Sequence, residues 1–152
     1  MFRVSRRVDY GLRLLIALAS DSAEGPQSTA SLAEKLDIPL AFLHQIGRSL
    51  IQAGILKASP GPGGGLRLNR SPESVTLRQV LEVLEGPIRL NGEEPGEALC
   101  STQGVWEKVQ AQLVNELEGI RLNGLAESVQ GKGDQSFYSL PQFDPQNNPI
   151  AI

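Results

Sequence analysis

The chain has 152 residues, about the length of one domain with its own core, and its 40% apolar content is ordinary for a globular protein. It contains no apolar run of the roughly 20 residues that a membrane-spanning helix needs and no signal-peptide layout, so we expect a cytoplasmic protein without a membrane partner. Residues 1–70 hold nine Lys/Arg against five Asp/Glu, whereas residues 71–152 hold five against twelve. The basic first half favours a phosphate-rich partner, and the alternative is uneven surface charge without a role.

The first 40 residues predict two helices and the start of a third. Val8 to Ser20 is nearly all apolar, which indicates a helix at the centre of the core. After a polar turn, Ser28 is a suitable N-cap for a short helix that ends near Asp37. Pro39 then favours the first turn of another helix, because its missing N–H would have no partner there.

The helix after Pro39 is the candidate recognition helix of a helix-turn-helix. Its apolar residues recur at intervals of three and four, and Gly54 is placed to end it. Its polar side carries Ala41, His44, Gln45 and Arg48. Short and hydrogen-bonding side chains on one helix face can reach base edges or phosphates.

A glycine and proline segment follows and predicts a wing. Every residue from Pro60 to Gly65 is glycine or proline, which excludes a helix, and the flanking Ile55-Leu56 and Leu66 to Leu68 read as short strands. The glycines are not a phosphate loop, because no Gly-Lys-Ser/Thr follows. A winged helix-turn-helix implies DNA as the partner.

The second half predicts helices that reach beyond this head. Thr76 is suited to cap a helix that ends at Gly86, and a second, long helix is expected from Thr102 to about Arg121. Its apolar ridge cannot be buried by a small three-helix core alone, so we expect a homodimer; the alternative is that the ridge packs within its own domain. The expected dimerisation residues are Trp106, Val109, Leu113, Leu117 and Ile120.

The chain therefore divides into four predicted parts, and the fold class is mainly α with a small β-hairpin. A winged helix-turn-helix is expected over residues 1–88, a sensor loop over 89–101, and the dimerisation helix with a short final helix over 102–130. Asn123 is the expected cap of that final helix, from Leu122 to Val129. Residues 131–152 are rich in Gly, Asn, Gln and Pro and predict a flexible tail to which we assign no role.

The motifs together resemble the Rrf2 family of bacterial transcription regulators over about residues 1–130. Known members include an iron-sulfur cluster regulator, a nitric-oxide-sensing repressor and a cysteine-metabolism repressor. The carriers of the resemblance are Asp9-Tyr10-Gly11, Leu32 to Lys35, Ile38-Pro39, Phe42 to Ile46, Leu50, Ala53 to Leu56, Gly61 to Leu68, and Thr76 to Val80 with Glu85-Gly86. The resemblance implies a winged-helix dimer whose long C-terminal helices cross.

The resemblance also implies which residues meet DNA: the start of the recognition helix enters the major groove and the wing tip lies against the minor groove. Arg6 and Arg7, ahead of the first helix, would contact phosphates. Pro60 replaces an arginine that relatives carry before the wing glycines, leaving Lys57 or Arg67 as displaced substitutes. The expected DNA contacts are Arg6, Arg7, Ser28, Pro39, Ala41, Phe42, His44, Gln45, Arg48, Lys57, Gly63, Gly64 and Arg67.

The sensor region departs from the cluster-binding relatives, which carry three cysteines before the dimer helix. This chain has one, Cys100, six residues before Trp106, and Gln103 stands where some relatives have a histidine ligand. We therefore expect no iron-sulfur cluster, no other cofactor and no metal site. No cation adjoins Cys100 to favour its reactive thiolate, so a weakly reactive thiol is expected.

These features predict a homodimeric, sequence-specific DNA-binding transcription regulator, and a repressor rather than an activator. No nucleophile-base pair, carboxylate dyad or metal-ligand spacing suggests an enzyme. A small-molecule effector or a protein partner could act through the loop and the dimer helix. Two alternatives remain: a cluster- or thiol-redox-sensing regulator that uses Cys100, and a protein-interaction module that reuses the winged helix to bind a partner.

Overall fold

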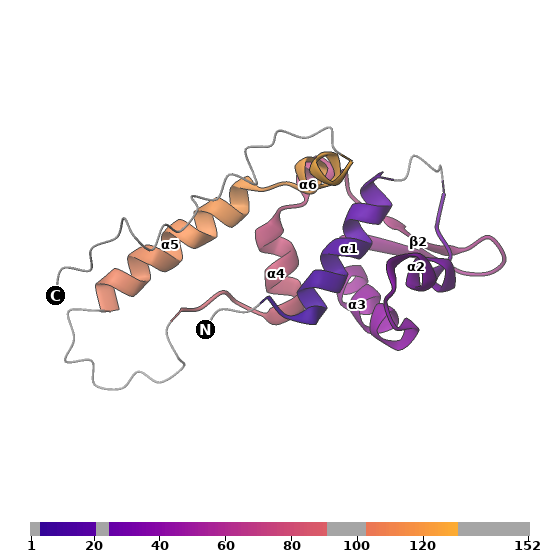
Figure 1. The fold of residues 1–152 in the computed structure, drawn as a ribbon, viewed down its shortest axis with the longest axis horizontal. Helices are drawn as coiled ribbons and strands as arrows, with labels where there is room; N and C mark the ends of the chain where they lie inside the picture. The colour runs from indigo at the N-terminus through magenta and orange to yellow at the C-terminus, as the bar shows by residue number, and fades with distance from the viewer. Residues whose placement is uncertain (1–3, 21–24, 91–102, 131–152) are drawn as a thin grey trace, which may run out of the picture.

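A computed structural model describes residues 4–20, 25–90 and 103–130. Six α-helices and one antiparallel hairpin are present in these ranges, which confirms the predicted fold class (Figure 1). The elements are α1 (Arg6–Ser20), α2 (Thr29–Leu36), α3 (Leu40–Gln52), β1 (Leu56–Ser59), β2 (Gly65–Leu68), the 3₁₀ turn η1 (Pro72–Ser74), α4 (Leu77–Glu85), α5 (Gln103–Gly119) and α6 (Leu122–Val129). The expected tail, residues 131–152, lies outside the described residues.

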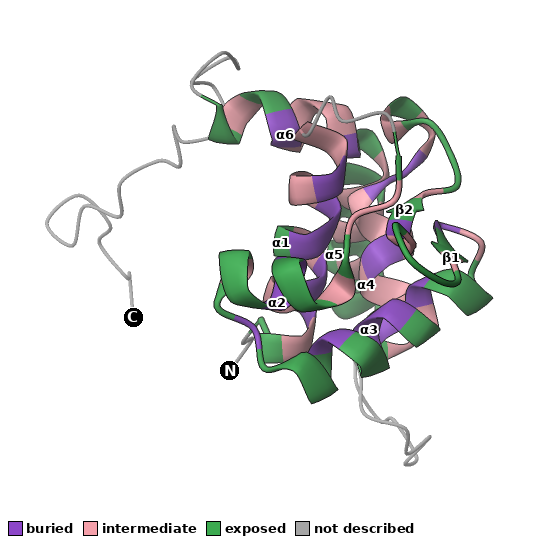
Figure 2. Cartoon of the chain, turned by 90° about the vertical axis from the view of Figure 1, so that its right-hand side faces the viewer, coloured by how far each residue is buried: buried purple, intermediate pink, exposed green. Residues whose placement is uncertain are grey.

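We call α1 to α4, the wing and α6 the head. Helix α1 forms its centre, as the apolar sequence of α1 predicts. It contacts α2, α3, α4 and α6, and Figure 2 shows buried segments along it. Its Leu14 and Leu15 are fully buried. Gly11 allows α4 to approach closely, since a Cβ there would lie 2.4 Å from Leu84 Cδ1. The first helix therefore supports the packing of most of the head.

The helix ends confirm most of the capping predictions. The Ser28 side chain accepts a hydrogen bond from the Ser31 N–H at the start of α2, and Thr76 forms a reciprocal capping box with Gln79 at the start of α4. Gly54, with φ of 72°, follows Ala53, the C-cap of α3, and the next N–H, of Ile55, bonds to the Leu50 carbonyl at 3.0 Å. This pattern ends a helix with a left-handed residue, where glycine carries no steric penalty.

Other boundaries differ from the sequence-based expectations. Arg6 and Arg7 form the first turn of α1 rather than preceding it, and Pro39 is the N-cap of α3 rather than a residue of its first turn. Helix α6 begins after Arg121, so Asn123 is not its cap. The reason is a tertiary contact: the Leu122 N–H bonds to the Val75 carbonyl at 2.9 Å, so the chain pairs with another segment before it turns into α6.

The wing is a short hairpin joined to the loop before α2. Its strands pair from Leu56 with Leu68 to Ser59 with Gly65. The N–H and carbonyl of Leu66 also bond to the carbonyl and N–H of Gln27, each at 2.8 Å. A Cβ on Gly65 would lie 1.9 Å from the Gln27 carbonyl oxygen, so only glycine fits beside this bridge. The wing is thereby fixed to the helix-turn-helix.

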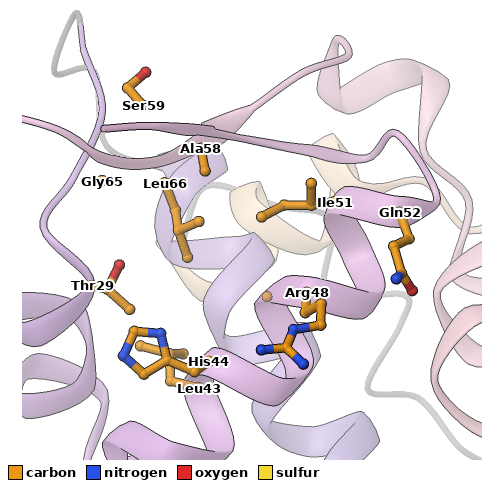
Figure 3. Close-up of a pocket in the computed structure, with 11 residues that line it drawn as sticks. Thr29, Leu43, His44, Arg48, Ile51, Gln52, Ala58, Ser59, Gly65 and Leu66 are labelled. Atoms are coloured by element: carbon orange, nitrogen blue, oxygen red, sulfur yellow. The ribbon is translucent and has the colours of Figure 1, made fainter. Parts of the chain in front are cut away.

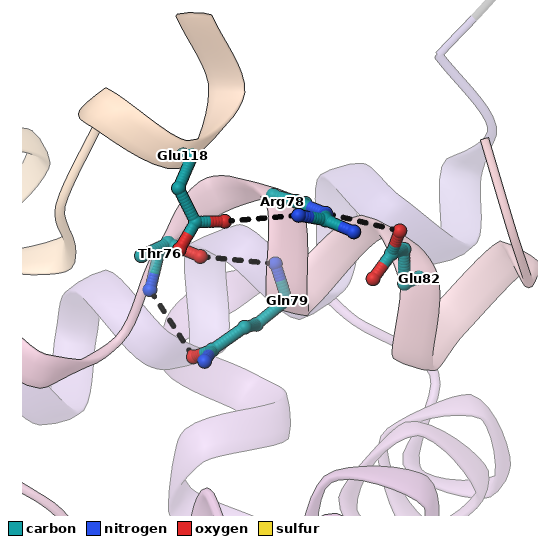
Figure 4. Close-up of polar contacts among 5 residues, drawn as sticks. All are labelled: Thr76, Arg78, Gln79, Glu82 and Glu118. Atoms are coloured by element: carbon teal, nitrogen blue, oxygen red, sulfur yellow. Dashed lines mark hydrogen bonds and ion pairs between the residues drawn. The ribbon is translucent and has the colours of Figure 1, made fainter. Parts of the chain in front are cut away.

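Helix α5 extends from the head and contacts it chiefly through α4, whereas α6 returns to pack on α1 (Figure 1). Arg78 of α4 pairs with Glu82 at 3.1 Å and reaches Glu118 of α5 at 3.7 Å (Figure 4). Ile120, expected within the long helix, lies just beyond its end, and its carbonyl accepts the Leu77 N–H at 2.9 Å. Among the described helices, none combines the length and the apolar character that a membrane span requires.

Candidate nucleic-acid interface

Helix α3 has one buried and one exposed face. Its inner face carries Leu43, Ile46, Gly47 and Leu50, all buried against the head. The predicted residues of the opposite face are all exposed, namely Ala41, His44, Gln45 and Arg48. The helix contains no Asp or Glu, so no carboxylate of its own would repel a phosphate. The outer face of α3 is thus free for a partner, and Gln52, which was not predicted, extends it by one turn.

A hydrogen bond from α1, continued by one within α3, orients this helix. Arg7 donates through Nη2 to the Ser49 hydroxyl at 2.9 Å, and the Ser49 hydroxyl in turn donates to the Gln45 carbonyl at 3.3 Å. Arg7 is half-buried, in contrast to the exposed Arg6. Arg7 therefore positions α3, a function that sequence reasoning missed because Ser49 lies 42 residues away. Arg6 remains the more accessible of the two predicted phosphate contacts.

Phe42 lies at the edge of the exposed face rather than at its centre. Its ring meets the Tyr10 ring of α1 edge-on, with centroids 5.9 Å apart, and Phe42 is 42% exposed. The guanidinium of Arg13 lies over the Tyr10 ring, 5.9 Å from its centroid. The exposed part of Phe42 is therefore held in place beside Ala41.

A groove separates α3 from the wing and has a volume of about 420 Å³ (Figure 3). His44 and Arg48 line it from the helix, and Ser59 lines it from β1 (Figure 3). Thr29 and Gln52 also line this α3–wing groove, although neither was predicted from the sequence. Their contribution depends on the packing of the hairpin over α3, which the local sequence does not encode.

The basic residues of the wing lie on its other face. Lys57 and Arg67 face each other across the two strands and are both exposed. Because side chains alternate along a strand, they point away from Ala58 and Leu66, which line the α3–wing groove. Two like charges directly opposite each other destabilise a hairpin, so this pair favours a bound anion.

The remaining predicted contacts are distributed around the same surface. Pro39 is exposed at the start of α3, and Gly63 is exposed at the wing tip beside the exposed Pro60. Gly64 is half-buried, and its N–H bonds to the Gly61 carbonyl at 2.9 Å, so it shapes the tip. Ser28 is exposed, but its hydroxyl oxygen already caps α2.

The predicted sensor, Cys100, lies outside the described residues. In the parts of the chain that the structure describes, no three His, Cys, Asp or Glu side chains gather where they could hold a metal ion. The sequence has one cysteine and one histidine, and His44 is on the exposed face of α3. This donor set does not fit a conventional iron-sulfur cluster, which requires several thiolates.

Comparisons with known proteins agree with this architecture. The model of the Rrf2 family, described as iron-dependent transcriptional regulators, matches residues 4–128. The chain is 31% identical over 142 residues to the HTH-type transcriptional regulator CymR of Bacillus subtilis, covering 91% of this chain and 99% of that protein. The solved structure of CymR, the global cysteine regulator of B. subtilis, matches with a TM-score of 0.74 at 30% identity, over 84% of this chain and 98% of that one. The solved structure of IscR of T. potens matches with a TM-score of 0.70 at 28% identity, and the match covers 91% of this chain and 97% of that one.

Proposed function

Because the chain belongs to the Rrf2 family of transcriptional regulators, we propose that it acts as a homodimeric repressor that binds specific DNA sequences through α3 and the wing. DNA-binding transcription regulation, not catalysis, is the activity of this family. The observation that carries the proposal is the exposed outer face of α3, which has no acidic residue and lies beside a wing. Chromosomal DNA as the partner places this action in the bacterial cytoplasm.

In the proposed complex, α3 enters the major groove with its first turns towards the bases. His44, Gln45 and Arg48 supply hydrogen-bond donors for base edges, and Ala41 and Phe42 supply apolar surface for thymine methyl groups. Arg6, Lys57 and Arg67 supply positive charge for the phosphates on either side. With Pro60 at its tip, the wing would contribute shape and backbone contacts more than arginine readout of the minor groove.

The dimer is supported by the exposed apolar ridge of α5. Trp106 is 49% exposed and Val109 41% exposed, and Leu113 and Leu117 are only half-buried although α5 contacts α4. A second copy of the helix would cover this ridge and give the two-fold symmetry common to homodimers. Two heads held by crossed helices would bind half-sites one helical turn, about 34–36 Å, apart. Ile120 would contribute least, because it lies beyond α5.

We further propose that the regulator works without a conventional iron-sulfur cluster, although its family is described as iron-dependent. One cysteine per chain cannot supply the thiolates of such a cluster. Regulation would then pass through an effector, a protein partner or the Cys100 thiol, each acting on the position of α5 relative to the head. Visible absorbance in protein purified anaerobically with its iron would contradict this part of the proposal.

Selection of bound sequences from random DNA, followed by fluorescence anisotropy on the enriched site, tests DNA recognition. We expect one palindromic site, with binding that weakens as salt increases because phosphate contacts release counterions. Arg48→Ala should weaken binding by about 1–3 kcal/mol and relax specificity at one position of each half-site. The matched control is Arg70→Ala, which removes an equally charged, exposed side chain that does not line the α3–wing groove.

Two outcomes would contradict the proposal. The first is that no sequence is enriched and that retention does not depend on salt. The second is that Arg48→Ala and Arg70→Ala weaken binding equally, which would indicate non-specific attraction. Retained binding of a protein partner in the Arg48→Ala variant, without any DNA binding by the unsubstituted chain, would favour a protein-interaction module.

A further inference from the structure

A second cavity of about 440 Å³ opens between α1, the end of α2 and the end of α6. It shares no lining residue with the α3–wing groove. Its volume lies within the range of small-molecule sites, about 300–1,000 Å³. We call it the α1–α6 cavity.

The walls of the α1–α6 cavity are largely apolar. Ile16 and Ala17 of α1 and Leu36 of α2 line it and are only partly buried, and Val129 of α6 is 64% exposed. These side chains come from three helices and converge on one space. Apolar surface that remains in contact with water in a concave site favours a hydrocarbon chain or ring.

The rim of the cavity carries two cations. Arg13 and Lys35 both line it, and no Asp or Glu is among its lining residues. Arg13 Nη2 pairs with Asp9 Oδ2 at 2.8 Å, but a guanidinium has five N–H donors in a fork. The Arg13 side chain is 51% exposed, so further donors can reach an anionic group at the mouth.

A hydrogen bond joins α1 to the residue after α6 beside the cavity. Gln130, which follows α6, donates through Nε2 to the carbonyl oxygen of Ser20, the last residue of α1, at 3.4 Å. Both residues line the cavity. This hydrogen bond links two of the three walls of the cavity.

We propose that the α1–α6 cavity binds a small amphipathic monocarboxylate, with its hydrocarbon part against Ile16, Leu36 and Val129 and its carboxylate at Arg13 and Lys35. Because α2 is the first helix of the helix-turn-helix and α6 follows α5 directly in the chain, a bound ligand would contact both the DNA-reading motif and the helix that follows α5. Ligand binding is measured without DNA, so it succeeds or fails independently of the proposed function.

Isothermal titration of the full chain with hexanoate, octanoate and decanoate tests the proposal. Affinity should increase about fourfold for each added methylene until the cavity is filled. Octanol has the same chain without the charge and should bind at least tenfold more weakly than octanoate. Octylamine has the opposite charge and should not bind.

Substitutions at the exposed Val129 then locate the site without disturbing the core. Val129→Asp should weaken octanoate binding at least tenfold through repulsion, and Val129→Lys should preserve or strengthen it. Arg13→Gln should also weaken binding, whereas Arg70→Gln, an equal loss of charge outside the cavity, should not. The proposal is overturned if none of the carboxylates binds, if octanol binds as well as octanoate, or if Val129→Asp and Val129→Lys have the same effect.

Discussion

The head and α5 bury their apolar residues to very different extents. In the head, Leu14, Leu15 and Leu43 are completely buried, and α6 adds Leu122 at 2% exposure. In α5, no described residue is buried, and its ridge faces outwards. A helix with an uncovered apolar ridge draws most of its stability from what packs against it. The head therefore has a core of its own, whereas α5 depends on α4 and, in our proposal, on a second copy.

The largest effect should come from truncation in the head. Leu14→Ala removes a fully buried side chain and should lower the free energy of unfolding by about 2–5 kcal/mol, since it leaves a cavity in the core. The matched Val109→Ala in α5 should cost much less in dilute protein, where dimers dissociate. Urea unfolding monitored by circular dichroism measures the free energy of unfolding of both variants. Equal losses would mean that the head and α5 do not differ in this respect.

The second prediction tests how α5 is covered. Val109→Glu places a charge on the ridge and should weaken dimerisation by about 3 kcal/mol or more, because an unpaired charge would be buried in the interface. Asn115→Glu introduces the same side chain on another exposed side of α5 and serves as the control. Sedimentation equilibrium gives the dissociation constants. A Val109→Glu dimer as strong as the control would mean that the ridge does not form the interface.

A smaller effect is expected at the junction between the two regions. Thr76 is 2% exposed, and its hydroxyl oxygen accepts the Gln79 N–H at 3.2 Å. Thr76→Val keeps the shape of the side chain but removes the cap of α4, which should cost about 1 kcal/mol of stability. Thermal unfolding measures this loss, and an unchanged melting temperature for Thr76→Val would show that the cap is dispensable.

The smallest effect concerns the ion pair between α4 and α5. Arg78, Glu82 and Glu118 are each partly exposed, and exposed pairs contribute at most about 1 kcal/mol. Arg78→Gln should leave the free energy of global unfolding almost unchanged. We expect instead faster amide hydrogen exchange at the end of α5, because its contact with α4 is weakened. Unchanged exchange in α5 would exclude Arg78 as the link between the two regions.

Local sequence determined much of the fold and of the candidate site. Ser28, Gly54 and Thr76 mark helix ends through bonds to residues a few positions away, and the periodicity of α3 identified its exposed face. Contacts between distant segments could not be predicted in this way. The bond from Arg7 to Ser49 changed the assigned role of one arginine, and the pairing of Leu122 with Val75 accompanies a cap of α6 at Arg121 instead of Asn123.

The bridge between Gln27 and Leu66 sets a rule for engineering new DNA specificity. Both of its hydrogen bonds involve only the main chain, so the side chain at position 27 can vary. A wing transplanted from a relative would have to retain glycine at positions 64 and 65, where a Cβ would lie within 2.2 Å of a backbone oxygen. The tip before them, from Pro60 to Gly63, is exposed, but the left-handed backbone at Gly61 and Gly63, with φ of 86° and 74°, favours glycine at these two positions, so the side chains at Pro60 and Pro62 are the ones that can vary. The hairpin can therefore be exchanged as a unit, provided that the main-chain bridge at Gln27 and Leu66 is kept.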